Sequence, residues 1–146
     1  MTQDKQNDKK IDHKLIRAEL ELVFEKYRQH KYYTLFITDY DVSVTSKIDE
    51  VGGGRSNNIS DNTADVAIKL VDKKSEAKKY VEKIEKAVEQ LPDIERELIE
   101  HRYMCKNYHY INDYTVYEVK MHISANTYRT IRKRALEKLY TMLIDK

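Results

Sequence analysis

The side chains best suited to chemistry lie in residues 124–146, which hold six Lys or Arg residues and only two Asp or Glu residues. Asn126 and Arg129 belong to this basic stretch. Arginine can donate hydrogen bonds to N7 and O6 of guanine, and asparagine can pair with N6 and N7 of adenine. The residue types therefore indicate recognition of base edges in DNA. The alternative is that these basic side chains are simply exposed to solvent and bind nothing.

An amphipathic helix is expected to carry these residues over 125–143, with Ser124 as its N-cap. Its buried side is predicted to hold Tyr128, Ile131, Ala135, Leu136, Leu139 and Leu143. The outward side is predicted to hold Ala125, Asn126, Arg129, Arg132 and Lys133. Because the first residues of such a helix can enter the major groove, the outward side is the predicted contact with DNA. Arg132, Lys133 and Arg134 are expected to touch phosphates, which adds affinity without sequence information.

A second, shorter helix is predicted just before it, over about 115–121. Thr115 and Glu118 have the spacing of a capping box, in which each side chain satisfies a backbone N–H of the first turn. His122 stands where a tight turn is needed, and histidine tolerates a left-handed conformation better than most residues. Two helices this close must cross steeply, which predicts a helix-turn-helix. The N–H groups near Thr115 are a further candidate phosphate contact.

Several stretches resemble a known group of regulators. The segments Leu91–Arg96 and Ser124–Leu139 are similar to region 4 of bacterial sigma factors, which reads promoter DNA. The pattern LP..ER.LIE.RY at 91–103, the Tyr-rich loop, DY.VYE at 113–118 and S.NTYR.I..RAL.KL at 124–139 resemble the ArpU, LtrC and RinA-like regulators of phage late genes more closely. By the resemblance to sigma factors, the base-reading positions are Ala125, Asn126, Arg129 and Thr130.

The rest of the chain predicts an all-α fold. Residues 1–10 are polar and are expected to form a frayed tail, not a signal peptide. Residues 11–90 are expected to form an N-terminal part of two helices, 11–33 and 63–90, capped by Asp12 and by Asp61 or Asn62. A glycine-containing connection over 34–62, with a short strand or hairpin, would join them. The heptad-like spacing of the second helix predicts packing on the first helix or a dimerising coiled coil. Residues 91–146 would form the helix-turn-helix domain, beginning with helix 92–105, in which Ile94, Leu98 and Ile99 face inward.

Other candidate sites carry weaker signals. Gly52–Gly54 lacks the Lys and Ser/Thr of a phosphate-binding loop. His101, Cys105 and His109 are spaced by four, but no fourth zinc ligand stands at a usual distance. The tyrosines at 103, 108, 110, 114 and 117 favour packing between helices over stacking on single-stranded bases. No nucleophile with a paired base and no catalytic carboxylate pair emerges, so we expect neither enzyme activity nor a cofactor.

The single cysteine fits a reducing compartment, and no apolar run is long enough to span a bilayer, which together predict a cytoplasmic protein. The leading functional hypothesis is a DNA-binding transcriptional activator of phage late genes. The resemblance implies that it acts at a promoter with host RNA polymerase, and we expect a homodimer. A DNA-packaging recognition subunit and a helical protein-interaction module are the alternatives.

Overall fold

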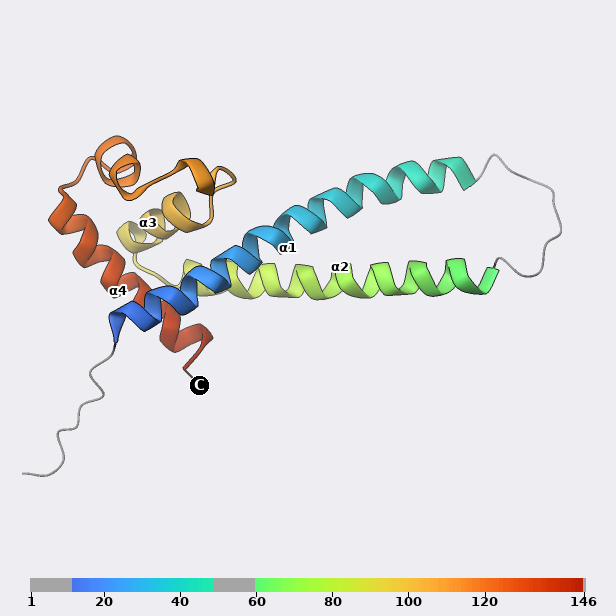
Figure 1. Cartoon of the computed structure of the whole chain (residues 1–146), viewed down its shortest axis with the longest axis horizontal. Coiled ribbons are helices and arrows are strands. Elements are labelled where there is room, and N and C mark those ends of the chain that lie inside the picture. Colours follow the sequence, from blue (N-terminus) through green and yellow to red (C-terminus); the bar gives the residue numbers. More distant parts are fainter. Residues whose placement is uncertain (1–11, 49–59, 146) are drawn as a thin grey trace, which may run out of the picture. The chain divides into compact units, whose positions relative to one another are not determined.

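A computed structural model describes residues 12–48 and 60–145, and every regular element in these ranges is helical. Four α-helices follow one another: α1 (His13–Ile48), α2 (Ser60–Glu89), α3 (Asp93–Tyr103) and α4 (Ala125–Leu143) (Figure 1). A 3₁₀ turn, η1 (Tyr108–Tyr110), and a π-helical segment, η2 (Thr115–Lys120), lie between α3 and α4. The prediction of an all-α fold is confirmed for the described residues. None of the described helices is long and apolar enough to cross a membrane.

The chain divides into two compact units, and α1 and α2 each contribute to both. The first unit, called the C-terminal unit below, comprises residues 1–25 and 86–146. The second, called the hairpin unit, comprises residues 26–85.

The C-terminal unit has a continuous apolar core. In α1, Leu20 and Phe24 are fully buried, and the ring of Phe24 stacks on that of Tyr103 with 5.3 Å between centroids. The beginning of α1 also reaches α4, because His13 Nδ1 lies 3.0 Å from Glu137 Oε1. The remaining buried apolar side chains of α3, η2 and α4 are Leu98, Ile99, Val116, Tyr128, Ile131, Ala135, Leu136 and Leu139. This core anchors α4 along one side over most of its length.

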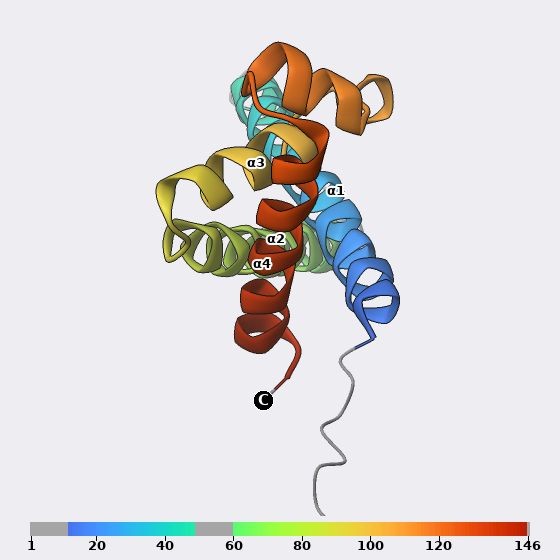
Figure 2. The ribbon, with the colours of Figure 1, turned by 90° about the vertical axis from the view of Figure 1, so that its left-hand side faces the viewer.

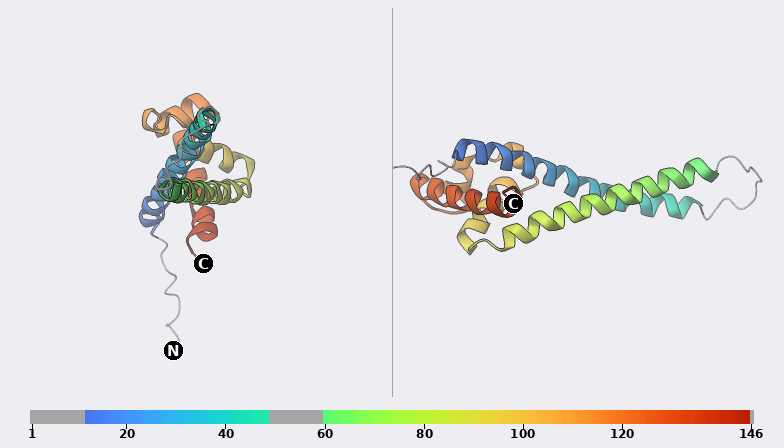
Figure 3. Two further views of the ribbon diagram at one scale, coloured as in Figure 1. Left: turned by 90° about the vertical axis from the view of Figure 1, so that its right-hand side faces the viewer. Right: turned by 90° about the horizontal axis from the view of Figure 1, so that it is seen from below.

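The hairpin unit pairs the second part of α1 with α2 in antiparallel fashion (Figure 3). Tyr27 donates a hydrogen bond to Glu85 Oε1 at 2.9 Å, and Lys31 Nζ lies 2.7 Å from the same oxygen. Between these two residues of α1, His30 makes an edge-to-face contact with Tyr80 at 5.1 Å between centroids. Burial acts to raise the pKa of the Glu85 carboxyl, but the hydrogen bonds from Lys31 and Tyr27 and the charge of Lys31 together lower it below its ordinary value.

The N-terminal helices differ from the prediction. Residues 34–48, expected to belong to a connection with a strand or hairpin, continue α1 instead. The β-branched and aromatic residues there cost an α-helix only fractions of a kcal/mol each, and no Gly or Pro interrupts the chain before Gly52. Thr34 is accommodated because its hydroxyl donates to the carbonyl of His30 at 2.8 Å. Gly52–Gly54 lies outside the described residues.

The predicted caps of the second helix are also wrong, since α2 begins at Ser60 and Asp61 and Asn62 lie inside its first turn. In α3, Leu98 and Ile99 are buried as predicted, but Ile94 is 45% exposed and Glu95 takes the inward position. The buried Glu95 carboxylate accepts hydrogen bonds from Lys138 Nζ of α4, at 2.9 Å to each oxygen. An ion pair thus joins α3 to the second half of α4.

Candidate nucleic-acid interface

A short turn joins η2 to α4. It spans residues 121–124, and Figure 2 shows η2 (orange) and α4 (red) joined by this short connection. His122 has a positive φ of 54°, and it is the only described non-glycine residue in that conformation. Ser124 Oγ then accepts a hydrogen bond from the Thr127 backbone N–H at 3.2 Å, so the predicted N-cap is confirmed.

The bounds of α4, Ala125–Leu143, match the prediction. Tyr128, Ile131, Ala135, Leu136 and Leu139 are buried, whereas Leu143 is only partly covered. The exposed members of the predicted contact set are Asn126, Arg129, Thr130, Lys133 and Arg134, and Ala125 is half-buried at the first turn. The first half of α4 therefore has one anchored side and one open side that is rich in hydrogen-bond donors.

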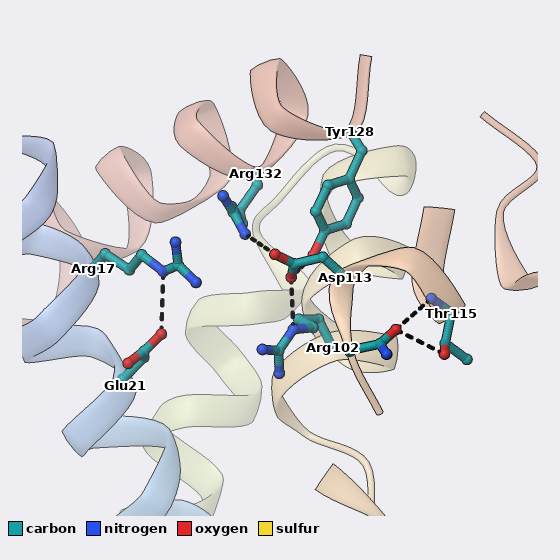
Figure 4. A network of polar contacts seen from close by, with 8 residues as sticks. Arg17, Glu21, Arg102, Asp113, Thr115, Tyr128 and Arg132 are labelled. Carbon is teal, nitrogen blue, oxygen red and sulfur yellow. Dashed lines mark hydrogen bonds and ion pairs between the residues drawn. The ribbon is translucent and has the colours of Figure 1, made fainter. Parts of the chain in front are cut away.

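Arg132 is the exception to the predicted outward side. Its side chain is only 15% exposed, and its Nη1 lies 2.9 Å from Oδ2 of Asp113. The other carboxylate oxygen, Oδ1, accepts from Arg102 Nε and from the Tyr128 hydroxyl, each at 2.8 Å (Figure 4). We call these four side chains the Asp113 cluster. The prediction that Arg132 faces outward is wrong, because it is held by a carboxylate inside its own unit.

The cluster strongly favours the ionised form of Asp113. Burial alone would raise the pKa of the Asp113 carboxyl, but hydrogen bonds from Arg102 and Tyr128 and the charge of Arg132 lower it from 3.8 to about 2. The pKa of the Tyr128 hydroxyl is raised, first by burial and then by its hydrogen bond to the same carboxylate. At neutral pH the cluster therefore contains two guanidinium cations, one carboxylate and a neutral phenol.

Thr115 also departs from its predicted role. Its backbone N–H donates to Asn112 Oδ1 at 2.8 Å, and its hydroxyl donates to the same oxygen at 2.9 Å. The helical winding starts at Asn112, whose carbonyl accepts from Val116 N at 3.3 Å. The predicted capping box of Thr115 and Glu118 is replaced by an Asn112 cap, so the Thr115 N–H is already engaged.

The tyrosine-rich stretch divides into buried and exposed rings. Tyr103 is buried in the core, whereas Tyr110 is almost fully exposed. Tyr117 links the exposed Tyr114 to the buried Tyr128, with 5.6 Å and 5.5 Å between the ring centroids. Among residues 12–48 and 60–145, no group of three or more His, Cys, Asp or Glu side chains is placed to hold a metal ion.

The central role of Asp113 was not predicted from the sequence. One signal was present: Arg132 follows Tyr128 by four residues, so both must lie on the same side of a helix. Since Tyr128 was predicted to be buried, Arg132 needed a nearby anion. Asp113 was part of the quoted DY.VYE pattern, but its distance in sequence from Arg132 hid the pairing.

Comparison with protein-family models, with curated proteins and with solved structures gave no match.

Proposed function

We propose that the chain is a sequence-specific DNA-binding protein whose recognition helix is α4. Ala125, Asn126, Arg129 and Thr130 would read base edges in the major groove, and Lys133 and Arg134 would contact phosphates. The support comes from the first half of α4, where Asn126 and Arg129 are exposed and Tyr128 and Ile131 are buried on the other side. The capped start of α4 and the short turn before it suit a helix-turn-helix of the kind found in sigma factor region 4.

Thr115 and Arg132 are not included among the proposed phosphate contacts. The Thr115 backbone N–H and Arg132 Nη1 are already hydrogen-bonded within the chain, and the Arg132 side chain is only 15% exposed. A phosphate would have to displace Asn112 from Thr115 or Asp113 from Arg132. Lys133 and Arg134 are exposed and require no such exchange.

We further propose that the protein regulates transcription, as an activator of phage late genes that works with host RNA polymerase. The sequence patterns at 91–103, 113–118 and 124–139, which resemble the ArpU, LtrC and RinA-like regulators, support this role. The protein would act as a homodimer, because two-fold operators are read by paired recognition helices.

The test is selection of duplexes from a random-sequence library by the full chain, followed by footprinting of the enriched site on its own genome. A regulator should enrich one sequence and protect a site beside a promoter. A DNA-packaging subunit would instead assemble as a ring on DNA away from promoters. Failure to enrich any sequence would leave only the protein-interaction module.

A further inference from the structure

The geometry points to Asp113 as a specificity-determining residue that holds Arg132 back from DNA phosphates while it positions the recognition helix. This inference rests on the proposed function, because it concerns how α4 separates its preferred site from other DNA.

The contacts of Asp113 tie together the end of α3, the residues just before η2 and the first half of α4. Its two oxygens receive donors from Arg102, Tyr128 and Arg132, all between 2.8 and 2.9 Å. Tyr128 and Arg132 lie one residue before Arg129 and three residues after it. A change at Asp113 is therefore transmitted to the part of α4 that would read bases, although Asp113 itself does not face them.

The same contacts restrain a cation. Arg102 and Arg132 are 12% and 15% exposed, so neither guanidinium is presented to solvent as Lys133 and Arg134 are. A mobile arginine on the DNA-facing half of the helix would bind any phosphate and strengthen binding to every sequence alike. By binding Arg132, Asp113 keeps this sequence-independent attraction low.

Asp113→Asn keeps the size of the side chain and removes its charge, and it should change the two affinities in opposite directions. Affinity for the preferred site should fall about tenfold, because Tyr128 and α4 lose a charged anchor. Affinity for a mixed-sequence duplex should rise, and the slope of log K against log salt concentration should steepen by about 0.9 as one more phosphate is neutralised. A variant that is only less stable would lose affinity for both duplexes in parallel.

Glu95→Gln is the matched control. It also removes a carboxylate that bonds a cation of α4, but Lys138 lies in the second half of the helix, away from Arg129. The ratio of specific to non-specific affinity should stay at its wild-type value. The double variant Asp113→Asn/Arg132→Gln should return the mixed-sequence affinity and the salt slope to wild-type values, because the released charge is gone.

The experiment is fluorescence anisotropy titration of the full chain at several salt concentrations. The probes are the duplex that wild type enriches from a random library and a mixed-sequence duplex of equal length. If wild type enriches a site and Asp113→Asn weakens both duplexes equally, or leaves both unchanged, the role of Asp113 is overturned and the proposed function stands. If wild type enriches no sequence, the proposed function fails, and this inference fails with it.

Discussion

The buried Glu95 carboxylate of α3 is paired with Lys138 of α4, whose Nζ lies 2.9 Å from each carboxylate oxygen. Glu95 takes the inward position beside an exposed Ile94, the reverse of what hydropathy predicts. The pair therefore holds α3 against α4 where the sequence suggested only apolar packing.

Lys138→Met should destabilise the C-terminal unit by about 1–3 kcal/mol, because it leaves the Glu95 charge buried without its partner. The lower part of this range is expected, since Lys138 itself is half-exposed and solvent screens the pair. Urea unfolding followed by circular dichroism measures the change. Lys133→Met, at an exposed position of the same helix, should leave the unfolding free energy within about 0.5 kcal/mol of wild type. Equal effects of the two substitutions would contradict this assignment.

Arg129→Ala should cost about 1–3 kcal/mol at the preferred DNA site and relax the base preference at one position, because a bidentate contact with guanine would be lost. Lys133→Ala should weaken specific and mixed-sequence duplexes to the same extent, because a phosphate contact carries no sequence information. Anisotropy titration with both duplexes separates the two. Parallel losses for both variants would show that Arg129 does not read bases.

Acid should weaken the Asp113 cluster in a defined window. The folded-state pKa of Asp113 is depressed to about 2, so its stabilisation is complete above the ordinary value of 3.8 and is lost as the pH falls toward 2. A shift of this size corresponds to at most about 2.5 kcal/mol, and screening at a 37% exposed side chain reduces this to about 1 kcal/mol.

The measurement is the difference in unfolding free energy between wild type and Asp113→Asn, taken from about pH 5 to about pH 2. The difference should shrink across this range. A difference that stays constant down to pH 2 would mean that the carboxylate charge does not stabilise the fold.

Substitutions at His122 should test whether the turn before α4 requires a left-handed backbone conformation. His122→Val should destabilise the unit by about 1–2 kcal/mol, because a β-branched residue disfavours a positive φ. His122→Gly should keep or slightly raise the stability, since glycine adopts this conformation without steric cost. Thermal unfolding of the two variants tests the order. Equal melting temperatures would show that the turn does not require the positive φ in solution.

The hairpin unit should mediate self-association. Ile68 and Val71 of α2 are 59% and 63% exposed, and exposed apolar side chains among the lysines of this helix suit contact with a second copy. Sedimentation should show a dimer at roughly tens of micromolar, and Ile68→Asp combined with Val71→Asp should shift it to monomer. Lys78→Ser, at an exposed site of the same helix, should leave the dimer intact. A wild-type monomer at that concentration would count against the hairpin interface.

The last helix could be predicted from sequence because its determinants are local. Ser124 caps it three residues before Thr127, and the spacing from Tyr128 to Leu139 follows the helical period. The continuation of α1 beyond residue 34 was missed for the opposite reason. Residues 34–48 are rich in residue types that are typical of strands, but they contain no Gly or Pro that would interrupt a helix. Local sequence patterns do not decide between a strand and a helix in such a stretch.

The contacts around the candidate site depended on side chains that are distant in sequence. The residues next to Asp113 in sequence do not predict its ion pairs with Arg102 and Arg132, because these pairs form only once α3 and α4 have packed. Burial of Glu95 has the same origin, since Lys138 follows it by 43 residues. Sequence patterns thus predicted the exposed Asn126 and Arg129, whereas the polar contacts that hold their helix required the fold.

The wide winding of η2 has an evolutionary consequence. Met121 N bonds the carbonyl of Val116, five residues back, so this turn accommodates one residue more than ordinary α-helical winding would. Removing one residue from Thr115–Lys120 would let the segment relax to standard winding and still deliver the chain to Ser124. Length variants among related chains should therefore concentrate in this segment and spare the four residues that follow it.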